Sequence, residues 1–500
     1  MNIFEEYIKI ITQLIKKNKK LLKLSEFDNF KGVTVELPPS HFNFDLSCNA
    51  ALILGKKNSI NPKFLAEEIR KLIISQLNDF DKVEVASPGF INLKFSQKSI
   101  VNIINKILEN KKEYGKRKSN NSYNIEFVSA NPTGPMHVGH CRGAIFGDVL
   151  ANLLKFNGNK VVKEYYINDY GAQIKNFVKS VYFRIRELQY KEKFNFEKDL
   201  YPGDYIIEIG KKIIASNKNL KFDNFEKSYN LLKDESLKYS MNQIKSDLKK
   251  LGIIHDNFFS ETKLVEKKLV DKAVNYLKKN NYVLEGYLEP PKGEINNEWK
   301  KIKRLIFKST LFGDDTDRAI QKNDGSWTYF ANDVGYHMDK INRNYEYLVN
   351  VLGADHSGYV KRIEAVVKAL SSYPVDFKVK IIQLVRLLKN KKPLKMSKRS
   401  GDYIMIYELL EDVSSDVIRF VMLLRKNDVP LDFDVDLILD KSKDNPVFYV
   451  NYAHARIHSI LSKASEAGLW LEPLSKSNVI TTNNFNIQEI RILIKLSEWP

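Results

Sequence analysis

"YNIEFVSANPTGPMHVGHCRGAIFGDVLANLL", residues 123–154, begins as a short apolar run, passes through a turn rich in Gly and Pro, and continues in a helical pattern. A second strand-like run, "KVVKEYYI", follows at residues 160–167. Strand, helix and strand in this order open a parallel sheet covered by helices. We therefore predict a Rossmann-like α/β domain. Ligands of such sheets bind beyond the carboxyl ends of the strands, where helix N-termini offer unpaired N–H groups.

The turn itself has the residues of a nucleotide site. His137 and His140 are three apart, so we expect both on one face of the first helical turn, where they could donate hydrogen bonds to a phosphate. Gly139 lets a flat ring or a phosphate approach the backbone. Gly143 and Gly147 would let the helix lie close to its strand. The alternatives are a His pair that caps the helix or binds a metal, although we identify no third ligand. The GxGxxG and GxxxxGK[ST] patterns are absent, which disfavours a dinucleotide fingerprint and a P-loop.

A second segment, "PLKMSKRSGDY" at residues 393–403, carries Lys395, Lys398 and Arg399 just before Gly401. A cationic loop with a glycine hinge suits the neutralisation of a leaving pyrophosphate. An exposed basic turn is the alternative interpretation in a chain this rich in Lys. HxGH after a first strand together with KMSK about 250 residues later is a far more specific pair than either motif alone.

The length of 500 residues and an apolar content of 43% predict two to four folded domains. We divide the chain at polar runs and changes of pattern. The predicted parts are an α+β module at 1–115, the α/β domain at 118–400 with a Lys-rich helical insertion at about 175–250, a connection at 401–444, and a helical domain at 445–500.

The charge favours a polyanionic partner. Lys and Arg number 80 against 61 Asp and Glu, a formal net charge of +19, which fits nucleic acid, although a Lys-rich composition could also serve solubility alone. Cys48 and Cys141 form no CxxC pair, so we expect neither a disulfide framework nor zinc, and a reducing cytoplasm. The N-terminus predicts an amphipathic helix rather than a signal peptide, and no apolar run has the length of a membrane span.

Several segments together resemble one family. "EFVSANPTGPMHVGHCRGAIFGDVLANLL", "YYINDYGAQI", "TYFANDVGYHMDK", "LGADHSGYVKR", "KMSKRSGDY" and "VNYAHARI" are similar to arginyl-tRNA synthetases of the bacterial type, which belong to class I. The resemblance covers the chain nearly end to end. It implies an arginine–tRNA ligase that joins arginine to ATP as arginyl-adenylate, releasing pyrophosphate, and then moves arginine to the 3′-terminal adenosine of its tRNA.

The resemblance also assigns the parts of the chain. The first module would contact the tRNA elbow, 401–444 the tRNA stem, and 445–500 the anticodon; a monomer is expected. The final residues, "ILIKLSEWP", stand in the middle of a helical pattern, so we expect a shortened anticodon-binding domain. Lysine-rich faces in the first module, the insertion and the last helices would follow tRNA phosphates.

For ATP, the resemblance implies a catalytic set and a binding set that overlap. The catalytic residues would be His137, His140, Lys395 and Lys398. The ATP-binding residues would be His137, Gly139, His140, Lys395, Met396, Ser397 and Lys398. Mg²⁺ would travel with the ATP, and no protein metal site is expected.

For arginine, the guanidinium has five donors in a planar fork and requires carboxylates. The family's pocket maps onto Ser129, Asn131, His140, Gln173, Glu261, Tyr329, Asp333 and His356. Tyr329 and Asp333 are four apart and share a face if their segment is helical, although such a pair alone is an ordinary helix face.

Three other functions remain open at this point. Another class I synthetase is possible, but the cysteinyl type would need zinc ligands. A catalytically silent tRNA-binding paralogue would not need to retain both histidines and both lysines. A small nucleotidyltransferase shares the HxGH chemistry but is usually far shorter. The insertion is short and charged, unlike an editing domain, and an arginine pocket with paired carboxylates needs no editing.

Overall fold

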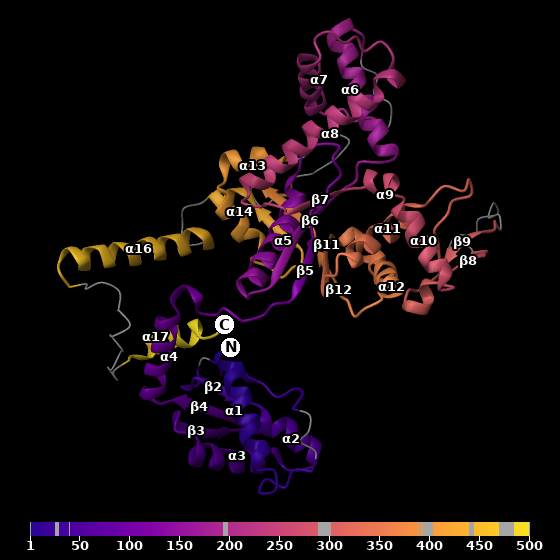
Figure 1. Ribbon diagram of the computed structural model, residues 1–500. Helices are drawn as coiled ribbons and strands as arrows, with labels where there is room; N and C mark the ends of the chain where they lie inside the picture. Colours follow the sequence, from indigo (N-terminus) through magenta and orange to yellow (C-terminus); the bar gives the residue numbers. More distant parts are fainter. Residues whose placement is uncertain are drawn as a thin grey trace. The chain divides into compact units, whose positions relative to one another are not determined.

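The computed structural model describes residues 2–25, 30–39, 41–193, 199–288, 302–389, 392–393, 404–439, 445–469 and 485–499. The chain forms two compact units (Figure 1). The first comprises Met1–Ser119, Phe156–Gly158 and Ile460–Pro500, and the second comprises Asn120–Lys155 and Asn159–Ser459.

The first unit is an α+β fold, as predicted. Its antiparallel sheet has the order β1-β2-β4-β3, with β1 at Val35–Glu36, β2 at Leu46–Cys48, β3 at Phe80–Ala86 and β4 at Phe90–Phe95. The helices are α1 at Ile3–Lys17, α2 at Ala50–Asn58, α3 at Pro62–Gln76, α4 at Gln97–Asn110 and the short η1 at Lys111–Glu113. α1 buries Ile3, Tyr7, Ile11, Leu14 and Ile15, the one-sided stripe of an amphipathic helix.

The last described helix, α17 at Ile487–Leu496, belongs to this first unit by its contacts. Ile494 is buried in the same core as the residues of α1, and the backbone N–H of Ile3 donates to the carbonyl oxygen of Ser497 at 3.1 Å. Our division by sequence assigned this helix to a separate domain at 445–500. The contacts group it differently because its apolar face packs on the N-terminal core.

The second unit is built on a five-stranded parallel sheet of order β12-β11-β5-β6-β7. Its strands are β5 at Ser122–Glu126, β6 at Lys160–Ile167, β7 at Asn257–Ser260, β11 at Tyr347–Gly353 and β12 at Asp376–Ile382. The first strand of this sheet in sequence, β5, lies in its middle. The chain adds β6 and β7 on one side of β5 and then β11 and β12 on the other. β5 and β11 therefore form the topological switch point at which ligands bind in open α/β sheets. The predicted parallel α/β fold is confirmed.

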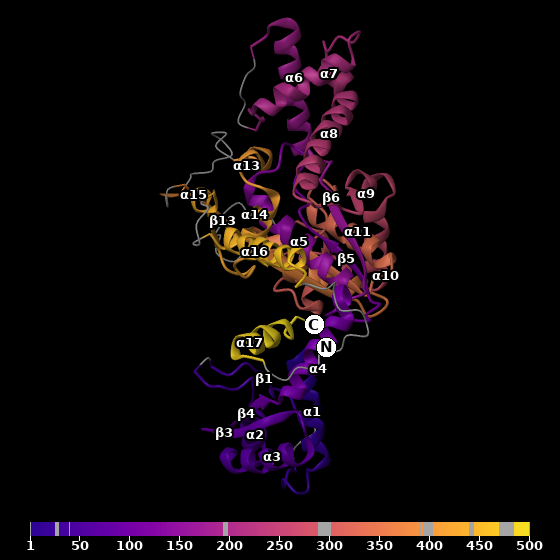
Figure 2. The same cartoon turned by 90° about the vertical axis from the view of Figure 1, so that its left-hand side faces the viewer.

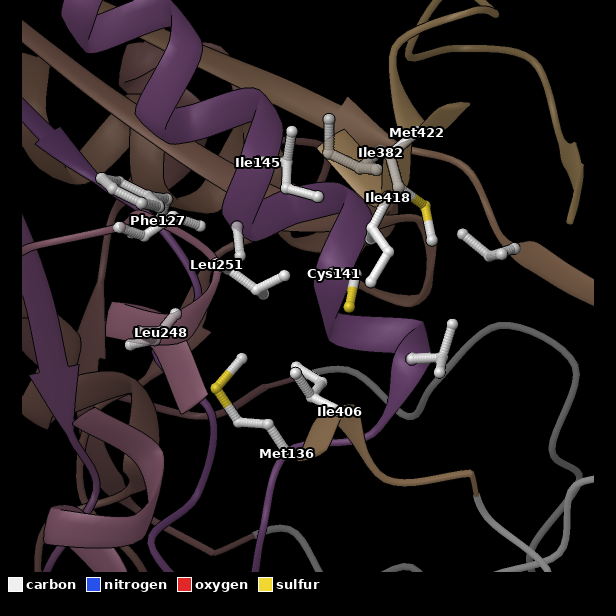
Figure 3. Packing of buried hydrophobic residues seen from close by; sticks show 14 of the residues in the cluster. Phe127, Met136, Cys141, Ile145, Leu248, Leu251, Ile382, Ile406, Ile418 and Met422 are labelled. Atoms are coloured by element: carbon white, nitrogen blue, oxygen red, sulfur yellow. The ribbon is translucent and has the colours of Figure 1, made fainter. Parts of the chain in front are cut away.

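Helix α5 at Val138–Phe156 follows β5 and packs closely on the sheet. A Cβ atom on Gly147 would lie 2.3 Å from Cγ of Phe127, so only glycine permits this approach. A Cβ on Gly143 would meet nothing within 4 Å, so the predicted close approach is wrong there. Figure 3 shows Phe127, Cys141 and Ile145 within the buried apolar core beside this helix.

The described residues of the Lys-rich segment after β6 form the helices α6 at Ala172–Tyr190, α7 at Asp204–Ser216 and α8 at Phe225–Lys250. They share an apolar cluster of their own that includes Phe177, Ile206 and Leu232. In both views they stand together at one end of the second unit (Figure 1, Figure 2).

The remaining elements belong to the second unit, except that the last turns of α16, from Ile460 on, are grouped with the first unit. Between β7 and β11 lie α9 at Thr262–Glu266, α10 at Leu269–Lys279, the antiparallel strands β8 at Val283–Gly286, β9 at Arg304–Phe307 and β10 at Arg318–Ala319, η2 at Ser309–Phe312, and α11 at Tyr329–Asn342. η3 at Ala354–Tyr359 and α12 at Val360–Leu370 connect β11 to β12. Further on are β13 at Val385–Lys389, β14 at Lys392–Pro393, α13 at Ile406–Asp412, α14 at Ser415–Met422, β15 at Leu431–Asp434, α15 at Val435–Leu439 and α16 at Pro446–Glu466.

Candidate active site

The loop after β5 leaves the sheet at the switch point in an unusual backbone conformation. Val128 has φ +69° and Ser129 has φ +41°, and a β-branched residue rarely adopts a positive φ. The Ser129 hydroxyl holds the loop on both sides, because it donates to Oε1 of Glu126 at 3.1 Å and accepts from the backbone N–H of Tyr166 at 3.0 Å. Such strain persists where the surrounding contacts impose it, and it concentrates at functional sites.

The two histidines lie together at the start of α5. The helix begins at Val138, so His137 directly precedes it rather than standing in its first turn. The ring centroids of His137 and His140 are 3.9 Å apart, and Nδ1 of His140 accepts from the backbone N–H of His137 at 3.2 Å. Gly139 is exposed between them, and a Cβ there would lie 2.9 Å from the His137 ring. The glycine therefore leaves both the imidazole pair and the backbone accessible.

The chain just beyond the second basic motif runs beside His137. The N–H of Val138 donates to the carbonyl oxygen of Ile404 at 3.1 Å, and the N–H of Ile406 donates to that of Met136 at 2.9 Å. The side chains of Met136 and Ile406 pack in the same core (Figure 3). Four residues of the predicted ATP site lie outside the described residues: Lys395, Met396, Ser397 and Lys398.

Two carboxylates near the switch point have hydrogen-bond partners but no cation. Glu261, directly before α9, is 4% exposed and accepts from Nδ2 of Asn332 at 2.7 Å. Asp333, in α11, accepts from the hydroxyl of Tyr359 at 2.5 Å. Across the ranges that the structure describes, neither carboxylate forms an ion pair with Lys, Arg or His.

The pKa values of both groups reflect their burial without an ion-pair partner. Burial raises the pKa of Glu261 to about 7, and the nearby Asp169 carboxylate adds to the shift. Burial likewise raises the pKa of Asp333 to about 7, with contributions from Glu126 and Glu261. The pKa of Tyr166 is raised by burial and then by the same group of acids. The two carboxylates are therefore a pair of buried acids that a cation would stabilise.

Two other buried carboxylates in this region are already neutralised. Glu126 accepts from Nζ of Lys340 at 2.5 Å. Glu164 accepts from Arg343 through both oxygens and from the hydroxyl of Tyr336 at 2.7 Å. Burial alone would raise the pKa of Glu164, but these bonds hold it down at about 2. Among the described residues, Glu126 and Glu164 therefore have a cationic partner, whereas Glu261 and Asp333 form no ion pair.

Asp169 fixes the turn that carries Glu261. Its carboxylate accepts from the Ser260 hydroxyl at 2.6 Å and from the backbone N–H of Thr262 at 2.8 Å, on either side of Glu261. Sequence reasoning did not single out this residue, nor Glu126, Tyr359 or Lys340. For Lys340 a signal existed, since it follows Asp333 by seven residues, on the same face of an amphipathic helix.

The other predicted arginine ligands are distributed around the site. Nδ2 of Asn131 donates to Oε1 of Gln173 at 2.9 Å, and Nδ2 of Asn168 donates to Oδ1 of Asn131 at 3.1 Å. Tyr329 shares α11 with Asp333 but is 67% exposed, and its ring lies 5.7 Å from Nζ of Lys322.

His356, in η3, is exposed beside Asp355. No hydrogen bond between described residues joins Tyr329 or His356 to Glu261 or Asp333. The structure therefore brings Asn131 and Gln173 together, but it leaves Tyr329 and His356 without a direct bond to the two pocket acids.

The described part of the chain contains neither a cluster of metal-ligating side chains nor a helix that could cross a membrane. No three His, Cys, Asp or Glu side chains gather there in a way that could hold a metal ion. None of the helices there combines the length and apolar character needed to span a membrane. Cys48 and Cys141 are buried free thiols.

Comparison with known proteins identifies the family. The profile described as "tRNA synthetases class I (R), catalytic domain" matches residues 103–440, and that described as "Arginyl tRNA synthetase N terminal domain" matches residues 6–95. The arginine–tRNA ligase of Pelagibacter ubique is 49% identical over 507 aligned residues, which cover 100% of this chain and 86% of the relative. The chain belongs to the arginyl-tRNA synthetases.

Other relatives agree with this assignment. The arginine–tRNA ligase of Roseobacter denitrificans is 41% identical with the same coverage of 100% and 86%. The arginyl-tRNA synthetase structure of Thermus thermophilus superposes with a TM-score of 0.68 over 98% of this chain and 85% of that one; at 17% identity it supports the fold alone. The predicted family and ligase activity are confirmed: the protein is an arginine–tRNA ligase, with arginine, ATP and tRNA as substrates.

Proposed function

We propose that Glu261 and Asp333 bind the guanidinium of arginine and that the strained loop after β5 holds its other end during formation of arginyl-adenylate. The observation that carries this proposal is the presence of two carboxylates that have raised pKa values and form no ion pair with a described Lys, Arg or His. A planar guanidinium matches them, because it offers several donors and a permanent charge.

At the other end of arginine, Ser129 and Asn131 would contact the ammonium and carboxylate. Their support is the resemblance and the contacts of Ser129 with Glu126 and of Asn131 with Gln173. His140 would lie between amino acid and nucleotide. Tyr329 and His356 would form the outer wall of the pocket.

ATP would bind at the entrance of α5. His137 and His140 would donate to the α-phosphate and ribose side, and the exposed Gly139 would receive the adenine. Lys395 and Lys398, with Met396 and Ser397 between them, would bind the departing pyrophosphate. Because arginine's own carboxylate attacks the α-phosphorus, alignment and charge stabilisation suffice and no covalent enzyme intermediate is needed. Mg²⁺ would arrive bound to the ATP phosphates, because this ion usually keeps several waters and binds substrate phosphates rather than an all-protein cage.

The remaining assignments are proposals of the same kind. Residues 1–115 would contact the tRNA elbow, 118–400 would carry catalysis, 401–444 would contact the tRNA stem, and 445–500 would contact the anticodon. We propose a monomer that acts in the cytoplasm.

The proposed function predicts a specific pattern of ATP–pyrophosphate exchange. With each of the twenty amino acids in turn, exchange should occur with arginine alone, and only when arginine tRNA is present. The measurement is incorporation of labelled pyrophosphate into ATP by the whole chain. ATP–pyrophosphate exchange with another amino acid, or exchange that does not depend on added arginine, would contradict the pocket assignment.

The raised pKa values predict that arginine binding releases protons. Near pH 6 the carboxyls of Glu261 and Asp333, with pKa values of about 7, are mostly protonated, and a guanidinium favours their ionised form. Arginine affinity should therefore rise as the pH increases from about 6 to about 8, and proton release should decline over the same range.

Calorimetric titration in two buffers of different ionisation enthalpy measures this release directly. Glu261→Gln should remove part of it. Arginine binding near pH 6 with no net proton release would show that these acids do not face the ligand.

A further inference from the structure

Lys340 is a fully buried cation close to the arginine pocket. It is 0% exposed, and its Nζ donates to Oε2 of Glu126 at 2.5 Å and to Oδ1 of Asn350 at 2.9 Å. A buried ammonium loses its hydration, and a hydrophobic side chain of similar size would often serve stability as well. Stability alone therefore does not require a charge here, and the residues that the ion pair holds in place suggest its role.

The partner of Lys340 is the residue that holds Ser129. Glu126 is the last residue of β5; one carboxylate oxygen accepts from Lys340 and the other from the Ser129 hydroxyl at 3.1 Å. The same hydroxyl accepts from the N–H of Tyr166 at 3.0 Å. Lys340 thus fixes the rotamer of Glu126. Glu126 in turn holds Ser129, which together with Val128 forms the part of the loop with positive φ.

The ion pair of Lys340 and Glu126 also lies at the switch point between β5 and β11. Glu126 of β5 is the register partner of Asn350 in β11, and Lys340 bonds to both side chains. Asn350 contacts Nε2 of His337 at 3.3 Å, and Nδ1 of His337 contacts the carbonyl oxygen of Asp333 at 2.8 Å. One buried lysine therefore connects the backbone at Asp333 with the loop at Ser129.

We infer that Lys340 and Glu126 are positioning residues for arginine: the ion pair sets the distance between the acids that bind the guanidinium and the loop that binds the other end of the amino acid. Neither residue touches the substrate. The inference rests on the proposed function through the assignment of Ser129 to arginine. It explains why a costly buried charge is placed here: a flexible apolar side chain could fill the space but could not orient the carboxylate.

The test compares Lys340→Met with Ser129→Ala and with the double variant. Lys340→Met should raise the KM for arginine about 10-fold or more and change the KM for ATP by less than about threefold. Because both changes act through the same hydroxyl, the double variant should be little worse than the more damaging single variant. Lys340→Arg, which keeps a charged donor, should stay within about threefold of the parent.

Lys163→Met is a matched control. Lys163 is buried as well and donates to Asp148 at 2.6 Å, and no hydrogen bond between described residues joins either side chain to Ser129. Lys163→Met should lower the unfolding temperature of the protein without raising the KM for arginine selectively. Should Lys340→Met fail to fold, Glu126→Gln, which keeps the volume, should show a smaller KM rise of the same selectivity.

The outcomes separate the two claims. If Ser129→Ala leaves the KM for arginine unchanged, the proposed function is wrong at Ser129. If Ser129→Ala raises that KM, but Lys340→Met raises the KM for arginine and ATP alike or adds its effect in full to Ser129→Ala, then the positioning role is wrong and the pair is structural only.

Discussion

Asp333→Asn is expected to raise the KM for arginine about 100-fold or more while the KM for ATP changes by less than about threefold. The amide keeps the shape and still accepts a hydrogen bond from Tyr359, whose hydroxyl lies 2.5 Å from the present carboxylate. It removes the negative charge, so a bound guanidinium would be desolvated without full compensation. Truncating one partner of a buried charged pair typically costs about 2–5 kcal/mol. Steady-state exchange kinetics with each substrate varied in turn provide the measurement.

Asp339→Asn is the matched control for this prediction. Asp339 lies on the same helix but pairs with Arg343 at 3.2 Å, so its substitution should leave the KM for arginine nearly unchanged. Equal losses toward arginine and ATP in Asp333→Asn would mean that the residue supports the fold and does not contact the substrate.

The fold was predictable because its signals are local. The pattern from Tyr123 to Leu154 contains a strand, a turn and a helix in adjacent residues, and a parallel sheet follows from such units. Glycine roles were only partly predictable. Gly147 and Gly143 look alike in sequence, yet only Gly147 lies under Phe127, and which face of α5 packs on the sheet is set by tertiary contacts.

The site was predictable only where a motif marked it. The histidines were found from their place in the turn after the first strand, and the acids at Glu261 and Asp333 through the resemblance. The sequence could not predict which acids lack an ion-pair partner. Glu126 and its partner Lys340 are 214 residues apart in the chain, and Glu164 and its partner Arg343 are 179 apart. The distinction between a paired and an unpaired carboxylate depends on three-dimensional neighbours, and it is this distinction that indicates the substrate.

Among the variants discussed, Arg142→Met is expected to lower the free energy of unfolding most. The Arg142 side chain, on α5 two residues after His140, is 1% exposed and donates four hydrogen bonds to backbone carbonyls. The acceptors are the carbonyl oxygens of Gln383 at 3.0 Å, Val429 at 2.7 Å, Arg425 at 3.3 Å and Lys426 at 2.7 Å. Methionine fills the volume but donates nothing.

Each buried carbonyl left without a donor costs about 1–3 kcal/mol, and water reaching some of them would recover part of this. We therefore expect Arg142→Met to lower the free energy of unfolding by about 3–6 kcal/mol, measured by urea denaturation. Arg386→Met, which breaks the exposed pair with Asp432 on β13 and β15, should cost less than about 1 kcal/mol. Equal stability of the two variants would mean that the four bonds contribute nothing net. A selective loss in Arg142→Met would instead show that the helix bearing His140 is fixed to the segments at 383 and 425–429 by one side chain.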